Sequence, residues 1–594
     1  KYHLIYSSNE QTWKFDRPVV FLGENCRLFS RKFVWSDMDA IVAKPFGLGQ
    51  INKDENYTKV KQLEEKIFPD LVNIMNRYHG YDYDQRFWEI ILGHWFKMFI
   101  PLAFKKISTL KKAFDIYNIS GTTITENENY KLATQDYGSS IDALYDEQWS
   151  HFFSCHIIKL LNINNFPLEI LKEDSNLSYF SNNKKNSLDK FYFLKKNIKK
   201  FGYLGYTTIA RKFVKENDAF IINSYLPFKE EIKIEISLGQ LPQLWTRHKL
   251  KLNKKPNNQL RNDLARSFEF KQENDIDRII SILLFELLPI CYLEGFEDLK
   301  KITESVSWPK FPKFIFTSNN FHSDEVFKLW SAIKVQNGTK YFIGQHGNNY
   351  GTLKNSFPRI EEKTADKFFT WGWKNNLQKF VPAFIFKTAA KKQKKYDKKG
   401  KLLLIESSFN EKYSYWDSYF EFIEYFEDQK KFISNIDKDP RKNLILKLDP
   451  NCIYKSFNEY NRWLEFDPNI KIELRNYNIF KLISKSRIVV HSYDSTGILE
   501  TLSLNIPTVA FWQNNLDHLC DNVKSDYRLL LDAGIIHLSA KSASEKINQI
   551  WNDVDSWWNQ NIVQDARKKF IEIYARNNNN PSKKIISLLT ENLL

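Results

Sequence analysis

Cysteine is scarce in this chain of 594 residues, and its spacing excludes two common stabilising sites. None of the five cysteines belongs to a CxxC pair: Cys26, Cys155, Cys291, Cys452 and Cys520. We therefore expect neither a disulfide framework nor a structural zinc site, and a reducing cytoplasm fits this usage best. No stretch near the first residue has the pattern of a signal peptide.

Long hydrophobic runs are missing too. The two longest, 90–104 and 279–293, are short or are interrupted by charged, histidine or proline residues. A helix that spans a bilayer needs about 20 predominantly apolar residues. The sequence therefore predicts a cytoplasmic protein that is soluble or lies peripherally on the inner membrane face.

Several cofactor motifs are also absent. The sequence contains no GxxxxGK[ST] phosphate loop, no GxGxxG dinucleotide motif, no HExxH and no cluster of Cys and His. The DxD triplet at 82–84 precedes an expected helix and follows no recognisable strand, and no DxD triplet lies at the end of an expected strand. We therefore expect a mechanism without a metal ion and without a bound cofactor.

What the sequence has is a large apolar and aromatic content with an excess of positive charge. Hydrophobic residues make up 42% of the chain and aromatic residues 15%, and the formal net charge is +16. A chain of this length is too long for one core, so two large domains are expected. The charge suits nucleic acid, an anionic membrane face or an anionic substrate, but a compositional bias that keeps the protein soluble explains it equally well.

Strands and helices alternate through much of the chain, which is typical of α/β proteins with doubly wound parallel sheets. We predict an N-terminal Rossmann-like domain over 1–390 with helical insertions near 57–78 and 85–110. A basic linker over 391–401 and a C-terminal Rossmann-like domain over 402–594 follow, and a helix near 556–575 is placed to cross back. The segment 171–200, rich in Asn, Ser and Lys, is predicted to be a surface insertion.

The stretch RIVVHSYDSTGILETLSLNIPTVAFW (487–512) predicts a parallel strand–helix–strand unit. Its turn places polar side chains before a helix N-terminus, which suits a phosphate: His491, Ser492, Ser495 and Thr496. Glu500, one turn further, is placed to accept hydrogen bonds from ribose hydroxyls. The alternative is that Asp494 or Ser495 only caps the helix.

A second constellation is YFIGQHGNNYG (341–351), a strand that ends in Gln345, His346 and Gly347. The glycines permit close approach of the backbone to a ligand, and a histidine at a strand end can exchange protons near neutral pH. The alternative is a structural histidine that caps the turn.

A third constellation is TSNNFHSDEVFKLWSAIK (317–334), in which Asp324 and Glu325 begin a helix directly after a strand. A helix dipole favours carboxylates in its first turn, so plain capping explains them. The functional alternative makes Asp324 a nucleophile or base that faces the cleft between the domains.

Weaker candidates lie in RYHGYDYDQRFWEIILGHWF (77–96), where His79, Arg86, Glu89 and His94 could bind an anionic sugar or an acceptor. Aromatic helix packing explains this stretch equally well. Lys447, Arg441 and Arg475 lie at or near strand ends of the C-terminal domain. They are candidates for binding a carboxylate or phosphate, and Lys447 is the one we assign to the donor.

These motifs, together with FLGENC (21–26), resemble bacterial transferases encoded in O-antigen loci near nonulosonic-acid genes. That family is similar, more distantly, to the retaining β-Kdo glycosyltransferases of capsule and lipopolysaccharide assembly. The resemblance implies a GT-B fold, two Rossmann-like domains facing across a cleft, and a CMP-activated keto sugar acid as donor. It also implies double displacement, with Asp324 as nucleophile, Glu325 or Glu89 as its alternatives, and His346 in acid/base work.

The sequence thus predicts a glycosyltransferase that moves a Kdo-like or nonulosonic sugar from CMP to a glycan or lipid-linked glycan. Ser492, Ser495, Thr496 and His491 would hold the CMP phosphate, Glu500 the ribose, and 345–347 the reacting sugar. The nearest alternatives are a GT-B enzyme with a UDP- or GDP-hexose or CDP-polyol donor, and a sugar-binding scaffold without activity. A nucleic-acid-binding protein is the alternative of another class, although we expect no nucleic acid partner.

Overall fold

The computed structural model describes residues 1–162, 167–172, 206, 210–322, 324–391, 396–407, 422–455, 457–475, 479–513 and 515–593. Within these residues the chain forms three sheets in which every strand pair is parallel. The fold is therefore α/β with Rossmann-like sheets, as the sequence predicts.

The first sheet has the order β3-β2-β1-β4-β5, the middle sheet β10-β9-β8-β7-β6, and the last sheet β13-β12-β11-β14-β15-β16. Their strands are β1 (Tyr2–Ile5), β2 (Val19–Phe21), β3 (Ala40–Val42), β4 (Ile119–Glu126), β5 (Leu168–Lys172), β6 (Phe220–Ile222), β7 (Phe314–Thr317), β8 (Lys340–Gly344), β9 (Lys367–Thr370), β10 (Phe380–Pro382), β11 (Lys401–Ile405), β12 (Leu444–Lys447), β13 (Ile472–Glu473), β14 (Ser486–His491), β15 (Thr508–Phe511) and β16 (Ile536–His537).

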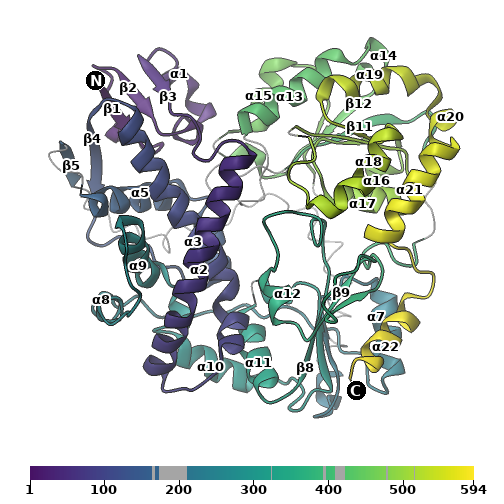
Figure 1. Ribbon diagram of the computed structural model, residues 1–594, viewed down its shortest axis with the longest axis horizontal. Helices are drawn as coiled ribbons and strands as arrows, with labels where there is room; N and C mark the ends of the chain where they lie inside the picture. Colours follow the sequence, from purple (N-terminus) through teal and green to yellow (C-terminus); the bar gives the residue numbers. More distant parts are fainter. Residues whose placement is uncertain are drawn as a thin grey trace.

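Two long helices separate the first sheet from the other two and form the centre of the molecule (Figure 1). They are α2 (Gln50–His79) and α3 (Gln85–Ile116), which meet at a tight turn. Gly80 ends α2 in the left-handed conformation at φ 71°, and the Asp84 side chain caps α3 by accepting from Phe87 N. Among the described residues, only α3 is long and apolar enough to cross a membrane, and 94% of its apolar window is buried inside the protein.

Shorter helices cover the sheets. In the first and middle parts of the chain they are α1 (Lys32–Trp35), α4 (Tyr137–Ala143), α5 (Glu147–Leu161), α7 (Phe228–Ser237), α8 (Asn258–Arg266), α9 (Asp275–Leu287), α10 (Phe296–Ser305), α11 (Glu325–Gln336) and α12 (Ile360–Thr364). Around the last sheet they are α13 (Phe422–Asn435), α14 (Lys438–Lys442), α15 (Glu459–Phe466), α16 (Phe480–Ile483), α17 (Thr496–Ser503), α18 (Lys524–Asp532), α19 (Ala540–Ile550), α20 (Val554–Trp558) and α21 (Asn561–Tyr574).

The chain ends in α22 (Pro581–Glu591), which returns from the last sheet to the middle one. Its buried residues Ile585, Leu588 and Leu589 belong to the same apolar cluster as Phe314 and Phe342 of the middle sheet. Burial of apolar surface contributes about 25 cal/mol of favourable free energy per Å². The packing of α22 therefore holds the last sheet against the middle sheet.

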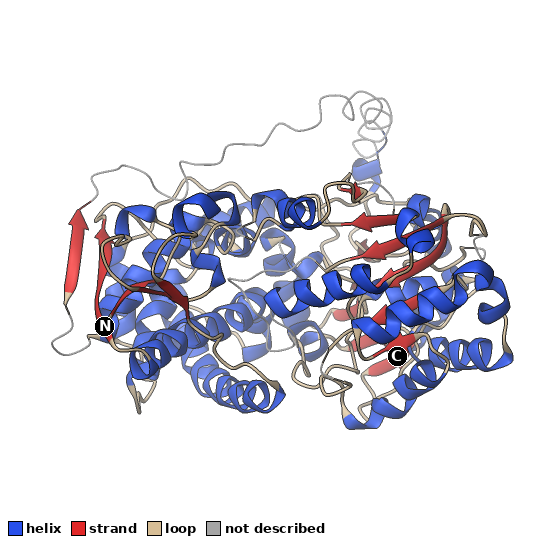
Figure 2. Cartoon of the chain, turned by 90° about the horizontal axis from the view of Figure 1, so that it is seen from above, coloured by secondary structure: helices blue, strands red, loops and turns tan. Residues whose placement is uncertain are grey.

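The first and last sheets also contact each other through side chains. Lys32 of α1 forms a 2.6 Å ion pair with Glu465 of α15, and the Arg462 guanidinium lies 4.3 Å from the centre of the Phe29 ring. Figure 2 shows the first sheet at one end of the molecule and the last sheet toward the other. The three sheets therefore surround a common centre.

Two features differ from the prediction. The residues 1–390, expected to hold one Rossmann-like domain, contain two separate parallel sheets. The reason is that strands β3 and β6 have only three residues each and are too short to give a strong strand pattern. The predicted insertion at 171–200 lies outside the described residues apart from the end of β5, as does 392–395 of the predicted linker.

Candidate functional site

The turn after β8 and the start of α17 lie against each other. Asn348 donates from its main-chain N–H to the Thr496 hydroxyl at 2.9 Å and from its side chain to Asp494 at 2.7 Å. A Cβ added to Gly347 would lie 3.3 Å from the same Thr496 hydroxyl, so a glycine allows this close approach. The carboxyl edges of the middle and last sheets, which the sequence marked independently, therefore form one site.

Further contacts hold these two edges in register. Leu353 and Leu519 form an antiparallel bridge, Lys354 N donates to His518 O at 2.9 Å, and Cys520 N donates to Thr352 O at 2.9 Å. Because these bonds join main-chain atoms, they fix the backbone on both sides of the site.

The N-terminus of α17 has no side-chain cap. Ser495 occupies the N-cap position with extended backbone, but its hydroxyl does not accept from the first turn of the helix. An uncapped first turn presents N–H groups and the positive end of the helix dipole, which together favour an anion. Ser492, just before this turn, lies 2.7 Å from the Tyr425 hydroxyl of α13. This helix start is the strongest candidate for binding a phosphate.

His491 lies beneath this turn and is only 1% exposed. Its Nδ1 is 3.4 Å from the Ser495 hydroxyl, and its Nε2 has no hydrogen-bond partner among the described residues. Burial lowers the pKa of His491 to about 3, so the ring is neutral at pH 7. A Cβ on Gly497 would lie 2.5 Å from the ring, which explains the glycine. His491 supports the turn from below.

Glu500, the predicted ribose ligand, forms a 2.6 Å ion pair with Lys387 from the segment after β10. The Thr388 and Ser503 hydroxyls lie 3.1 Å apart and join the same two segments. Burial raises the pKa of Tyr225, Lys387 opposes that shift and Glu500 adds to it, so both charges act near that ring. The ring of Tyr225 lies 6.0 Å from that of His346.

His346 itself lies at the carboxyl end of β8 and is linked to a buried carboxylate. Its Nδ1 is 3.0 Å from the Tyr350 hydroxyl, which donates to Glu361 of α12. Burial lowers the pKa of His346 to about 4, against the opposing effect of Glu361. The imidazole is therefore neutral at pH 7 and able to accept a proton.

The contact with Tyr350 selects one tautomer of the neutral His346 ring. The Tyr350 hydroxyl has one proton, which it gives to Glu361, so Nδ1 of His346 carries the ring proton and donates it to the Tyr350 oxygen. The other ring nitrogen, Nε2, is then unprotonated and can accept a proton.

Two other histidines pack around Glu361. His94 of α3 hydrogen bonds to Glu361 at 3.2 Å, and its ring is 4.9 Å from that of His322. The ring of His322 is in turn 5.5 Å from His346. Burial raises the pKa of Glu361, but His94, His322 and Arg359 outweigh it and hold that pKa well below its usual value. Glu361 is therefore ionised, and burial lowers the pKa of His94 so that its ring is neutral.

Gln345 has a positioning role in this turn. Its side-chain oxygen accepts from Trp371 N and from the Trp373 indole, both at 2.8 Å, and its amide donates to Gly347 O at 2.8 Å. All these partners are protein groups, so Gln345 holds the loop that carries His346.

Asp324 caps a helix, which is one of the two roles that its sequence position allows. Its carboxylate accepts from Phe327 N at 3.0 Å, His248 N at 2.8 Å and Asn320 Nδ2 at 3.0 Å, and the residue is fully buried. Burial raises its pKa against these bonds. The geometry thus corrects the expectation that Asp324 faces the cleft, because no oxygen is exposed for attack.

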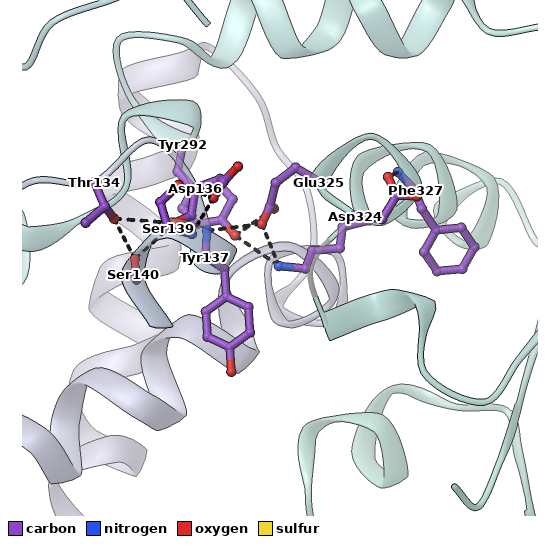
Figure 3. Close-up of polar contacts among 10 residues, drawn as sticks. Thr134, Asp136, Tyr137, Ser139, Ser140, Tyr292, Asp324, Glu325 and Phe327 are labelled. Carbon is purple, nitrogen blue, oxygen red and sulfur yellow. Dashed lines mark hydrogen bonds and ion pairs between the residues drawn. The ribbon is translucent and has the colours of Figure 1, made fainter. Parts of the chain in front are cut away.

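Glu325 lies in a separate buried cluster (Figure 3). It accepts from Lys328 Nζ at 3.0 Å, the Tyr292 hydroxyl at 2.7 Å and Tyr137 N at 3.3 Å. Lys328 is fully buried, so each charge compensates the other. This ion pair explains Glu325 without a catalytic role, contrary to the expectation.

The weaker candidates join helices to their neighbours. His79 hydrogen bonds to Tyr292 O at 2.9 Å, Arg86 bonds to Thr364 O and pairs with Asp366 at 3.0 Å, and Glu89 pairs with Lys363. These contacts agree with the packing alternative. Lys447, which ends β12, donates to the adjacent Leu448 O at 2.6 Å, and Arg475 pairs with Glu473. Of the 77–96 stretch, only His94 reaches the neighbourhood of His346.

Sequence reasoning missed Tyr350, Glu361, Asn348 and Lys387. Tyr350 and Asn348 lie in the quoted GQHGNNYG motif, so the motif contained the signal. Nothing in the sequence links Glu361 or Lys387 to it, because both reach the site through tertiary packing. In the described part of the chain, no group of three or more His, Cys, Asp or Glu is arranged to hold a metal ion.

One family model matches nearly the whole chain. The sequence model of the LIC12162 family of transferases matches residues 2–589. No curated protein gives a significant match.

Solved structures with a similar fold are only distantly alike. MurG from Acinetobacter baumannii has 10% identity over 63% of this chain and 91% of that chain, with a TM-score of 0.29. A proposed UDP-N-acetylglucosamine 2-epimerase from Listeria monocytogenes has 10% identity over 64% and 96%, with a TM-score of 0.35. The wall teichoic acid polymerase TagF has 11% identity over 50% and 84%, with a TM-score of 0.29. Likenesses this low assign no function.

Proposed function

The chain belongs to the LIC12162 family of transferases, and we propose that it is a glycosyltransferase whose donor is a CMP-activated keto sugar acid. The observation that carries this proposal is the hydrogen bond from Asn348 N to Thr496, which brings an acid/base histidine beside an uncapped helix start. Sugar transfer from a nucleotide donor needs both a phosphate-binding group and an acid/base group. The two must lie no further apart than the length of one donor molecule.

The donor phosphate is assigned to the first turn of α17, with Ser492, Ser495 and Thr496 as hydroxyl donors. A single helix N-terminus suits one phosphate, which is what a CMP-sugar has. Glu500 is assigned to the ribose, and it would accept from ribose hydroxyls while keeping Lys387 as its counter-ion. Gly347 allows the loop that carries His346 to lie close to the Thr496 hydroxyl.

A keto sugar acid also has a carboxylate, and two cations act on this neighbourhood. Arg359, whose guanidinium lies 4.1 Å from the centre of the Tyr350 ring, lowers the pKa of His346. Lys387 opposes the rise that burial causes in the pKa of Tyr225 beside it. Lys387 is paired with Glu500, and Arg359 lies beside the carboxylates of Glu361 and Glu362, so the preference for an anionic sugar over a neutral hexose rests on the resemblance to β-Kdo transferases.

His346 is assigned as the general base. Its neutral ring takes the proton of the acceptor hydroxyl as the acceptor oxygen bonds to the sugar carbon. The bond from that carbon to the phosphate oxygen breaks, and the electron pair leaves with CMP. The proton is taken by Nε2, Nδ1–H continues to donate to Tyr350, and Glu361 balances the charge of the imidazolium so formed. Neither Asp324 nor Glu325 takes part, because both are buried in structural contacts.

A donor panel tests this proposal. Purified protein is incubated with CMP-Kdo, CMP-sialic acid, UDP-N-acetylglucosamine, GDP-mannose and CDP-glycerol, and nucleotide release is followed by chromatography. We expect release of CMP from at least one CMP-sugar, and loss of that release in Glu500→Ala. Release of UDP, GDP or CDP-derived product with none from either CMP-sugar would overturn the donor class.

A further inference from the structure

A cavity lies between the first sheet and the helices of the last sheet, apart from the turn that carries His346. Its volume is about 490 Å³. The segments that follow β2 and β3 form one wall, α3 and α5 form a second, and the start of α13 forms a third. Ligands of parallel α/β sheets bind beyond the carboxyl ends of the strands, which is where β2 and β3 meet this cavity.

One side of the cavity is positively charged. Lys44 follows β3 and is exposed, and Lys105 and Lys106 lie on the same turn of α3. Two carboxylates line the cavity as well: Glu24, which forms a 2.5 Å ion pair with Arg27, and Glu424. The three lysine side chains are complementary to a phosphate or carboxylate group.

The other side is aromatic. Phe422 and Phe457, on the side of the last sheet, stack with their ring centres 3.7 Å apart and an angle of 8° between the planes. Phe46 and Trp149 line the cavity from the first part of the chain. Side chains of this kind bind an apolar body by excluding water from it. The cavity therefore combines a cationic rim with apolar walls.

The cavity is joined to the donor site by one helix. Phe422, Ile423 and Glu424 of the first turn of α13 line it. The next residue, Tyr425, lies 2.7 Å from the Ser492 hydroxyl and accepts from Ser407 N at 2.7 Å. The first turn of α13 thus has the cavity on one face and the candidate phosphate turn on the other.

We propose that this cavity binds an anionic amphiphile, a phosphate or carboxylate group joined to an apolar chain. The lysines hold the anionic group, and the aromatic walls hold the chain. That this amphiphile is the acceptor of the transfer rests on the proposed function, whereas its binding does not.

Binding of farnesyl phosphate to the full chain, without any donor, tests the proposal. Titration calorimetry is run with farnesyl phosphate, farnesol and inorganic phosphate. We expect farnesyl phosphate to bind at least about tenfold more tightly than either half of the molecule, since each half loses one set of contacts. The variants Lys44→Glu and Lys105→Glu are expected to weaken it about tenfold or more.

Lys313→Glu is the matched control, because Lys313 is exposed at the amino end of β7 and does not line the cavity. It is expected to leave the affinity unchanged. Equal binding of farnesyl phosphate and farnesol, or no effect of either cavity variant, would overturn the proposal. Binding that depends on Lys44 and Lys105 in a protein that releases no CMP from any CMP-sugar would support the cavity and contradict the proposed function.

Discussion

The main-chain N–H of Asn348 donates a 2.9 Å hydrogen bond to the hydroxyl of Thr496. This bond joins residues that are far apart in the sequence, one in the turn after β8 and the other at the start of α17. Because Asn348 lies two residues after His346, the bond sets the distance between the acid/base group and the helix start. The predictions below follow from that arrangement.

Replacing Thr496 with valine tests this bond, since valine keeps the shape and removes the acceptor. The Asn348 N–H then loses its partner, which costs about 1–3 kcal/mol if it stays buried. We expect the KM for the donor to rise about tenfold, measured by initial rates. Thr496→Ser retains the hydroxyl and is expected to behave like the native protein. An unchanged KM in Thr496→Val would show that this junction does not position the donor.

His346→Gln removes the proposed base while retaining a polar side chain. We expect kcat to fall about 10²–10⁴-fold, the usual range for general acid–base catalysis, with the affinity for CMP nearly unchanged. His156→Gln is the control, because His156 pairs with Glu286 on another part of the molecule. Transfer rates and calorimetry with CMP separate the two effects. A variant at His346 that turns over at the native rate would exclude this base.

Glu361→Gln tests the group behind His346. Glu361 raises the pKa of His346 against burial, which lowers that pKa to about 4, so removal of the charge lowers it further. We expect kcat to fall about tenfold or more with little change in KM, because the charge is needed only when the imidazolium forms.

The pH profile of kcat gives a second readout of Glu361. The acid limb, expected near pH 4 in the native protein, should move to lower pH in Glu361→Gln. Glu362→Gln is the matched control, since Glu362 accepts from Arg359 N and a glutamine oxygen retains that bond. Equal losses of kcat in the two variants would indicate a general packing effect.

The sequence predicted most of the strands and helices that form the site, but few of the side-chain contacts that hold the site residues in place. The strands β8 and β14 and the helix that follows β14 were predicted, because buried apolar runs end abruptly in polar residues. The first two strands were expected as well, but the short strands β3 and β6 gave no comparable pattern, so the division of 1–390 into two sheets was missed.

Side-chain roles at helix starts were harder to predict. Asp324 and Ser495 both occupy N-cap positions, but only Asp324 makes the cap, with three donors around it. Their different surroundings come from tertiary packing, which a local pattern does not contain. The role of Glu361 could not be predicted for the same reason, because its partner His94 lies in α3, more than 260 residues away in the sequence.

Asp324→Asn separates capping from covalent chemistry. Asparagine keeps one acceptor oxygen and loses the other, so we expect a loss of stability of roughly 1–2 kcal/mol. The transfer rate at 20 °C should stay within a few-fold of native. Thermal unfolding and initial rates are measured on the same sample. A folded variant with almost no turnover would restore Asp324 as the nucleophile.

His491 is expected to make stability depend on pH. Its folded pKa of about 3 lies below its ordinary value of 6.5. The unfolded chain therefore binds a proton that the folded one does not as pH falls from 6.5 toward 3, and stability is lost over that window. The loss is at most about 1.4 kcal/mol per pH unit for one group.

His491→Gln removes this titration. Urea unfolding at pH 7.5 and pH 5 should show a smaller difference in the free energy of unfolding for the variant than for the native protein. The buried His537, whose pKa is also lowered to about 4, provides a comparison through His537→Gln. An unchanged pH dependence in both variants would mean that these rings are protonated in the folded protein.

A crystal structure of the full chain with CMP tests the assignment of the phosphate to the start of α17. We expect density for the phosphate at the main-chain N–H groups of Thr496 and Gly497, with the ribose within hydrogen-bonding distance of Glu500. Density for CMP in the cavity lined by Lys105 and Phe457, with the start of α17 unoccupied, would contradict it.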